Sequence, residues 1–342
     1  MPRLMSAVVL ALAVLAAGCS DDQPDTAPPS TTAPTTLPST TLPSTTLPST
    51  TLPSTTVPPT TVPAAPSASA SDLCAITPPA TEPVVVESGL LTEVSGIAFS
   101  RQHDNVVWAH NDSGGSARLH ALDADTGADL GAWALSGAAA FDWEDMALVE
   151  GPFGVQHLYA ADFGDNFRLR SDIRIYRAVE PPNLSVSEAL PTNEFIFTYP
   201  GGAADAESFF VDPATGDFIV ITKTSDGTPA TIYRGPADTQ PETSTPMEKV
   251  GEVDLDGLSP SATAADITGD GSVIGIRTYA EVLLWDRAPG QTIGEALAGE
   301  SCLAPSTAER QGEALTFLPD GSGYVTISEG DNPPVHWFKA AE

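Results

Sequence analysis

The feature that most constrains the fold is a pattern that recurs five times, an oxygen-bearing residue followed by alternating apolar residues. The copies begin at Ser95, Glu144, Glu207, Thr263 and Glu313, about 50 to 60 residues apart. A repeat of that length built from short strands is typical of a β-propeller blade. Because the start of each innermost strand faces the axis of a propeller, these five residues are predicted to converge on one point.

Strand and turn signals between the copies predict the same fold. Three strands follow most copies but only two follow the last one, and an unassigned strand, Pro83 to Leu91, precedes the first. Pairing that strand with the last repeat closes the ring and removes exposed sheet edges. The sequence therefore predicts an all-β, five-bladed propeller over residues 73–342, with Thr292–Ala298 as a weak outer strand. A six-bladed propeller is the alternative if residues 180–193 or 288–305 hold a degenerate blade.

The first 72 residues are predicted to lie outside the propeller. Residues 1–18 resemble a lipoprotein signal peptide, with a basic start, a short apolar stretch and small residues before Cys19, which would carry the lipid. An ordinary signal peptide that contains a cysteine is the alternative. Residues 19–72 are rich in Thr, Pro and Ser and are predicted to form a disordered, extended tether. These segments predict a bacterial cell-surface protein whose propeller lies outside the cytoplasm and meets the membrane only through its lipid anchor.

The formal net charge of −31 restricts the classes of partner. Such a chain repels the phosphate backbones of DNA and RNA and the surface of anionic lipids. The charge attracts divalent cations or keeps the protein soluble, and we expect a monomer.

Two cysteines lie within the predicted propeller. Cys74 precedes the first strand and Cys302 precedes the last repeat, so closure of the ring would bring them toward each other. An exported location permits a disulfide between them. Two free thiols are the alternative.

The five converging residues predict a metal site. Three glutamates near one axis repel one another, and at least one would hold a proton unless a cation were bound. Ca²⁺ takes oxygen ligands, which the side chains of Ser95, Glu144, Glu207, Thr263 and Glu313 can supply, whereas zinc prefers sulfur and imidazole. We therefore expect a Ca²⁺ ion at the axis, with a catalytic or a purely structural role. Hydrogen bonds from backbone amides to the glutamates are the alternative.

The loops after the second strands are expected on the same face as the axial residues. They contain basic groups that could hold a phosphate or carboxylate bound to Ca²⁺, and acidic or phenolic groups that could orient water. The candidate catalytic residues are Asp112, Asp165, Arg168, Lys223, Arg277 and Tyr279. Ion pairs with neighbouring acids are the alternative role for the basic members.

The order Ser, Glu, Glu, Thr, Glu resembles that of the calcium-activated nucleotidases, the animal-type apyrases, which carry Ser-Glu-Glu-Ser-Glu around an axial calcium in five blades. Val107–Asp112 and Asp217–Lys223 are also similar to segments of that family. The family's Asp-Asp-Arg-Thr-Gly is Asn111–Gly115 here, without the arginine, and its paired arginines are reduced to Lys223. The chain is similar as well to bacterial propellers described as phytase-like or esterase-like.

Two functions follow from these expectations. The first, implied by the resemblance, is calcium-dependent hydrolysis of a phosphorylated or otherwise anionic small molecule. The second is a non-catalytic binding module whose axial face captures a cell-wall, glycan or protein partner. Because a propeller can serve either function, only the side chains at the axis can distinguish hydrolysis from binding.

Overall fold

Alternating apolar and polar residues, separated by turns that contain Asp and Gly, form strands along the described chain. The computed structural model describes residues 68–77, 83–113, 115–255, 257, 259–309 and 311–339. Cys19, the predicted signal peptide and the predicted tether up to residue 67 lie outside the described residues. No helix in the described ranges is long and apolar enough to cross a membrane.

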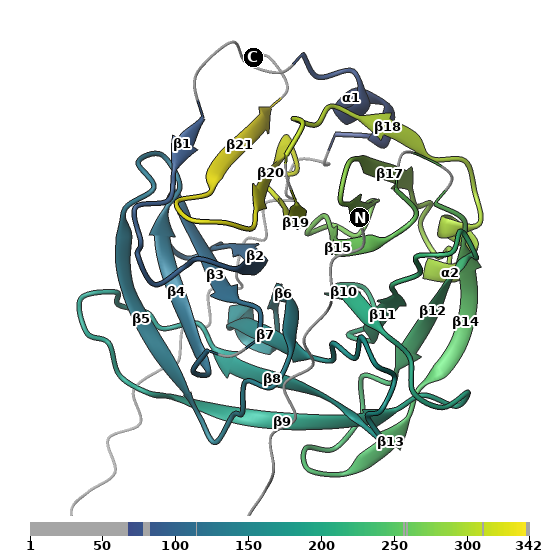
Figure 1. Cartoon of the computed structure of the whole chain (residues 1–342), viewed down its shortest axis with the longest axis horizontal. Helices are drawn as coiled ribbons and strands as arrows, with labels where there is room; N and C mark the ends of the chain where they lie inside the picture. The colour runs from purple at the N-terminus through teal and green to yellow at the C-terminus, as the bar shows by residue number, and fades with distance from the viewer. Residues whose placement is uncertain are drawn as a thin grey trace, which may run out of the picture. The chain divides into compact units, whose positions relative to one another are not determined.

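The strands form four-stranded antiparallel meanders around a common centre, an all-β, propeller-like arrangement (Figure 1). Each innermost strand contacts the next, and the last contacts the first, so the inner ring is closed. The innermost strands are β2 (Val94–Phe99), β6 (Trp143–Glu150), β10 (Ala206–Val211), β15 (Ala262–Ile267) and β19 (Gly312–Phe317). Every residue of β2, β10 and β19 is buried, as expected for strands at the centre of such a ring.

The first two meanders join into one sheet. Their outer strands are β3 (Val106–Asn111), β4 (Arg118–Asp123), β5 (Asp129–Ser136), β7 (Gln156–Asp162), β8 (Ile173–Val179) and β9 (Leu190–Thr198). The strands β5 and β9 pair in parallel, with Leu135 opposite Leu190. Because β2 and β6 also contact each other, this eight-strand path nearly closes on itself. A short strand that the sequence patterns do not predict, β13 (Ser244–Pro246), adds to β9 in parallel.

The other three meanders are separate sheets. Their outer strands are β11 (Phe218–Thr222), β12 (Ala230–Gly235) and β14 (Glu248–Val253), then β16 (Val273–Thr278), β17 (Val282–Asp286) and β18 (Cys302–Ala304), then β20 (Gly323–Ser328), β21 (Pro334–Lys339) and β1 (Val84–Val85). Residues 180–193 and 288–305, all of which the structure describes, contain no further meander.

The outer strand of the β15 meander is not where the sequence predicts it. Thr292–Ala298 contains a helix, α2 (Ile293–Leu297), so the prediction of a strand there is wrong. The reason is a capping box, in which the Thr292 side chain accepts the Glu295 N–H and the Glu295 carboxylate accepts the Thr292 N–H. The strand β18, which pairs with β17, completes the sheet instead.

The N-terminal part of the described chain attaches at two places. Strand β1 pairs with β21, with Val84 opposite Val335, as the sequence predicts for that strand. Ahead of it, helix α1 (Ala70–Cys74) begins before the domain boundary expected at residue 73. Cys74 forms a disulfide with Cys302 of β18. The disulfide therefore fastens this segment to the β15 meander, and not to the β19 meander where the ring closes.

The same segment meets the ring at the ends of the strands that lie away from the axial residues. The Ala68 N–H donates to the Gly321 carbonyl at 3.2 Å, and the Ala70 N–H donates to Asp286 Oδ1 at 2.8 Å. Gly321 lies in the turn that follows β19, whereas Glu313 lies at its start. Residues 68–70 and the axial residues are therefore on opposite faces of the ring.

A buried carboxylate ties three innermost strands together. Asp145 of β6 is fully buried and accepts the N–H of Phe209 in β10 at 2.8 Å and the N–H of Ala265 in β15 at 3.0 Å. Asp266 of β15 repeats the arrangement toward β19 by accepting the Phe317 N–H at 2.8 Å. Burial raises the pKa of Asp145 well above its usual value, and the backbone donors oppose that rise. Side-chain bonds of this kind hold the inner strands in contact, because strands of different meanders share no backbone ladder at the centre.

Asp145→Ala is expected to destabilise the protein by about 3 kcal/mol or more, because it leaves the buried N–H groups of Phe209 and Ala265 without an acceptor. Urea denaturation of the disulfide-intact protein measures the change in the free energy of unfolding. Asp320→Ala is the control, since Asp320 accepts hydrogen bonds from Ser322 in an exposed turn. A loss of stability no larger than that of the control contradicts the role assigned to Asp145.

Candidate functional site

The five axial residues all occupy β-bulges. In each innermost strand the pairing register with the second strand skips one residue, and the skipped residues are Ser95, Glu144, Glu207, Thr263 and Glu313. None of the five exposes more than 5% of its surface. A bulge re-aims the side chain of the extra residue and is frequent beside functional sites. The same position of every repeat is thus withdrawn from the backbone ladder, which frees its side chain for contacts across the ring.

The two hydroxyl residues among them bond to neighbouring strands. Ser95 Oγ donates to the carbonyl of Glu144 at 2.5 Å, and Thr263 Oγ1 donates to the carbonyl of Gly312 at 2.7 Å. Each bond joins one innermost strand to the next, β2 to β6 and β15 to β19. These hydroxyl groups therefore fasten the ring, and their oxygen lone pairs remain as acceptors.

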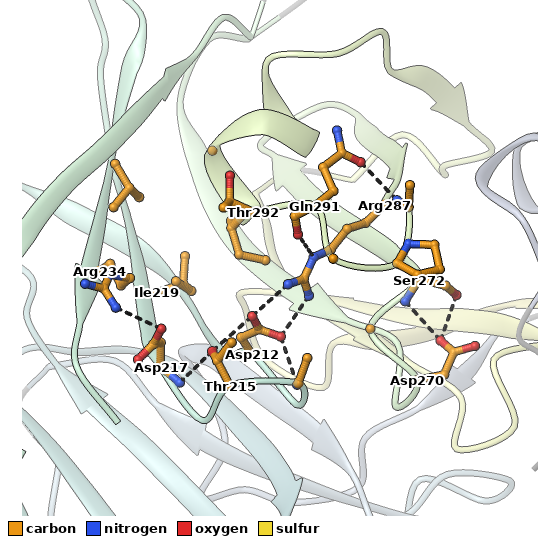
Figure 2. A pocket seen from close by; sticks show the side chains of 18 of the residues that line it. Asp212, Thr215, Asp217, Ile219, Arg234, Asp270, Ser272, Arg287, Gln291 and Thr292 are labelled. Atoms are coloured by element: carbon orange, nitrogen blue, oxygen red, sulfur yellow. Dashed lines mark hydrogen bonds and ion pairs between the residues drawn. The ribbon is translucent and has the colours of Figure 1, made fainter. Parts of the chain in front are cut away.

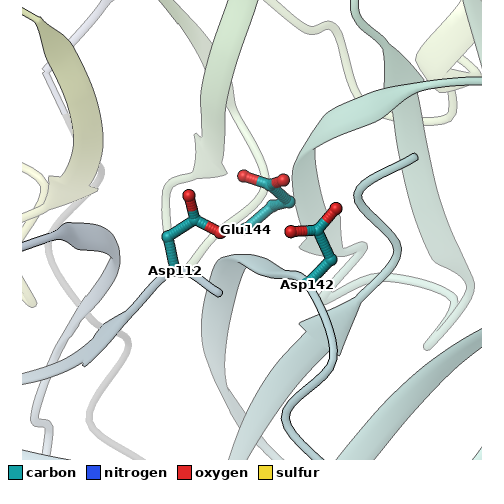
Figure 3. A group of neighbouring side chains, drawn as sticks. All are labelled: Asp112, Asp142 and Glu144. Carbon is teal, nitrogen blue, oxygen red and sulfur yellow. The ribbon is translucent and has the colours of Figure 1, made fainter. Parts of the chain in front are cut away.

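A carboxylate cluster surrounds the start of β6 (Figure 3). One oxygen from each of Asp112, Asp142 and Glu144 lies within 4.8 Å of the others. Gly164 makes room for it, because a Cβ there would lie 2.1 Å from Glu144 Oε1 and 2.6 Å from Asp142 Oδ2. Asp142 is absent from the sequence-based candidates, although its place two residues before Glu144 is a signal that could have found it.

Burial and mutual repulsion raise the pKa values of these carboxyl groups. Burial raises the pKa of Asp112 to about 7, and the charge of Asp142 adds to the rise. Burial raises the pKa of Glu313 to about 8, with the charge of Glu207 as the next cause. Burial and the charge of Glu207 likewise raise the pKa of Glu144 well above its usual value. The site therefore favours bound protons or a bound cation over a set of unneutralised carboxylates.

Lys223 brings a positive charge to the site. Its ammonium group forms an ion pair with Glu207 and donates a hydrogen bond to the Tyr279 hydroxyl at 2.6 Å. Burial nevertheless outweighs the ion pair and raises the pKa of Glu207 to about 7. Among the residues that the structure describes, the second oxygen of Glu207, Oε2, is buried without a hydrogen-bond partner, and so is Oδ1 of Asp112. Two acceptor atoms are thus left for a ligand.

Arg277, which the sequence predicts on the open face, is buried instead. It exposes 2% of its surface and forms an ion pair with Glu309. Its guanidinium lies against Gly312, where a Cβ would come within 2.2 Å of Nη2. Burial lowers the pKa of Arg277, and the charge of Glu309 opposes this change. Arg277 therefore supports the strand that carries Glu313 from within the protein.

Asp165 and Arg168 belong to the loop after β7. The Asp165 carboxylate accepts the N–H groups of Leu169 and Arg170, both at 2.8 Å, and so holds the loop in one conformation. Arg168 is exposed and has a positive φ of 53°. Phe167 and Leu169 on either side of it expose 84% and 83% of their surfaces. The loop is therefore internally bonded, yet presents large apolar side chains to solvent.

A groove of about 760 Å³ lies between the β10 and β15 meanders, at the ends of these strands away from the axial residues (Figure 2). Within it, Arg287 donates to both oxygens of Asp212 at 2.8 and 2.9 Å, and Arg234 pairs with Asp217 at 3.1 Å. In the described part of the chain, no side chain lining this groove has a buried polar atom without a partner. The polar side chains of the groove are thus satisfied, whereas the axial residue Glu207 has a buried oxygen without a partner in the described residues.

No protein-family model matches the chain, and no curated protein matches its sequence. The chemistry of the axial site is therefore inferred from its own side chains.

The stability of the metal-free protein is expected to fall as the pH rises from about 5 to 9. The folded pKa of Glu313, about 8, lies above its usual value of 4.5, so the stability it contributes is present at low pH and is lost as the pH passes 8. Glu313→Gln should remove a pH-dependent contribution on the order of 4 kcal/mol.

Urea denaturation in a chelator at several pH values in this range measures the effect. Glu188→Gln, at an exposed position of the loop before β9, is the control. Identical pH dependence in Glu313→Gln and the unaltered protein would show that the Glu313 carboxyl is not held in this environment.

Proposed function

We propose that the chain is a five-bladed β-propeller whose axial carboxylates bind Ca²⁺. The observation that carries the proposal is Oε2 of Glu207, a buried acceptor without a partner in a ring of crowded carboxyl groups. The donor set of the site consists of oxygen atoms, which Ca²⁺ prefers. Glu144, Glu207 and Glu313 would hold the ion, with the hydroxyl oxygens of Ser95 and Thr263 as further ligands.

For the activity we propose hydrolysis of a phosphorylated or otherwise anionic small molecule. A bound Ca²⁺ would offset the carboxylates and polarise the ester group. Asp112, whose carboxyl lies beside Glu144, is the candidate general base for the attacking water. Lys223 and Tyr279 bring N–H and O–H groups to the same site. The resemblance to the calcium-activated nucleotidases and to phytase-like propellers supports this activity.

For the location we propose the bacterial cell surface, with the chain lipid-anchored at Cys19 and held by its Thr-, Pro- and Ser-rich segment. The disulfide between Cys74 and Cys302 supports an oxidising compartment. Residues 68–70 meet the ring on the face opposite Glu313, so the described chain enters the ring away from the carboxylates.

Ca²⁺ is expected to raise the melting temperature of the protein and to be required for phosphoester turnover. Glu144→Gln should abolish both effects, because it removes one carboxylate from the centre of the oxygen cluster. Melting curves in Ca²⁺ and in chelator test binding, and release of phosphate from a panel of phosphomonoesters tests activity. Glu188→Gln should keep the full Ca²⁺ shift. Absence of a Ca²⁺ shift in the unaltered protein overturns the metal site, and a shift without turnover of any ester overturns the hydrolase.

A second candidate function is capture of a partner in the cell envelope, which the exposed loop after β7 favours. Phe141, Phe167 and Leu169 expose 69%, 84% and 83% of their surfaces. Arg170 links Phe141 to this loop, with its guanidinium carbon 5.3 Å from the centre of the Phe141 ring. Ordered apolar side chains on a surface mark contact sites, because little conformational freedom is lost when a partner binds them.

If capture is the function, the Cys19→Ser protein, which cannot carry the lipid, sediments with a washed cell-envelope fraction, and the added double change Phe167→Ser with Leu169→Ser abolishes this association. The Ca²⁺ shift of the double variant should be unchanged, because neither side chain belongs to the carboxylate site. Phe153→Ser is the matched control, since Phe153 is fully exposed in the turn at the other end of β6. Equal sedimentation of the Cys19→Ser protein with and without the double change excludes this role for the loop.

A further inference from the structure

We propose that Lys223 and Tyr279 form an arm that binds a phosphoryl oxyanion beside the axial carboxylates, with the Tyr279 hydroxyl as a hydrogen-bond donor to the ligand. The inference rests on the cation site proposed above. The arm selects a chemical class of ligand, the phosphoryl group. Its Tyr279 hydroxyl is a hydrogen-bond donor, which the carboxylates are not when ionised.

The hydrogen bond between Lys223 and Tyr279 can run in one direction only. The Lys223 ammonium has N–H donors and no acceptor, so the phenolic oxygen of Tyr279 must accept in the 2.6 Å bond between them. The hydrogen of the Tyr279 hydroxyl therefore points elsewhere. Within the described part of the chain the hydroxyl makes no other hydrogen bond, so this hydrogen is free for a ligand.

The arm is held in place before any ligand binds. The Lys223 nitrogen lies 4.9 Å from the centre of the Tyr279 ring and also pairs with Glu207. The carbonyl of Tyr279 accepts the N–H of Gly312 at 3.3 Å, which fixes the turn after β16 beside the start of β19. Tyr279 is half-buried, so solvent reaches it. A donor fixed in this way binds without a further loss of conformational freedom.

The surrounding charges determine the class of ligand. The charges of Glu207 and Glu313 act on Tyr279 and would repel an anion on their own. Where a bound cation offsets these carboxylates, an anion can bind and bridge that cation and the arm. Glu207 and Tyr279 use two N–H groups of Lys223, and an ammonium has three. A phosphoryl group can offer a separate oxygen to the cation, to the third Lys223 N–H and to the Tyr279 O–H, whereas a carboxylate has to share one oxygen between two of them.

Methylphosphonate titrations of the protein with saturating Ca²⁺, followed by calorimetry or by the phosphorus NMR signal, test the inference. Tyr279→Phe keeps the ring and removes the hydroxyl, so it should weaken binding about tenfold or more. Lys223→Met, a second variant, should weaken binding as well because it removes the ammonium that orients the phenol. Tyr233→Phe, at a buried tyrosine of β12, is the matched control and should bind as the unaltered protein does.

The Ca²⁺ melting shift, measured on the same samples, separates this inference from the proposal on which it rests. A retained shift in Tyr279→Phe together with weakened methylphosphonate binding supports the arm. A retained shift with affinities within about twofold of the unaltered protein in both variants overturns the arm and leaves the Ca²⁺ site standing. Methylphosphonate that fails to bind to the Ca²⁺-loaded, unaltered protein also overturns it. A missing Ca²⁺ shift in the unaltered protein removes both proposals.

Discussion

The contact on which the ring depends is the Asp145 carboxylate at its centre. Innermost strands of neighbouring meanders lie side by side without a shared backbone ladder, so side chains must join them. Asp145 reaches from β6 to both β10 and β15, and Asp266 continues the chain of contacts to β19. Each bond satisfies a buried N–H that would otherwise remain without a partner, which is costly in a protein interior. These bonds link β6, β10, β15 and β19 at the axis.

The same convergence that allows strands to be joined also crowds carboxylates. Next to Asp145 in β6 is the bulge residue Glu144, whose pKa is raised by burial and by the charge of Glu207. The charge of Glu207 also raises the pKa of Glu313, while Lys223 pairs with Glu207. At Asp145 the carboxylate accepts backbone N–H groups of neighbouring strands and so holds those strands together. At Glu207 Oε2 no N–H group of the described residues donates in this way, and an acceptor is left over. The carboxylates of Asp145 and Asp266 therefore join strands, whereas Glu207 keeps a buried oxygen without a partner in the described residues.

The repeat and its alternating strands could be predicted because both are local patterns in the sequence. The innermost strands begin where the repeats begin, and β1 pairs with β21 as expected. Features that depend on distances between strands could not be predicted: the role of Asp145 requires N–H groups 64 and 120 residues away. Arg277 looked like a ligand-binding cation, yet a glycine at position 312 lets its guanidinium pack inside. The helix α2 was missed because its capping box competes with a weak strand pattern.

The disulfide between Cys74 and Cys302 has a mechanical consequence. Tension applied to the chain ahead of residue 68 would pass through α1 and cross directly into β18 by a covalent bond. The two-residue pairing of β1 with β21, which lies later in the chain, would carry none of that load and would not be peeled from the ring. The pull would enter the ring on the face opposite Glu313.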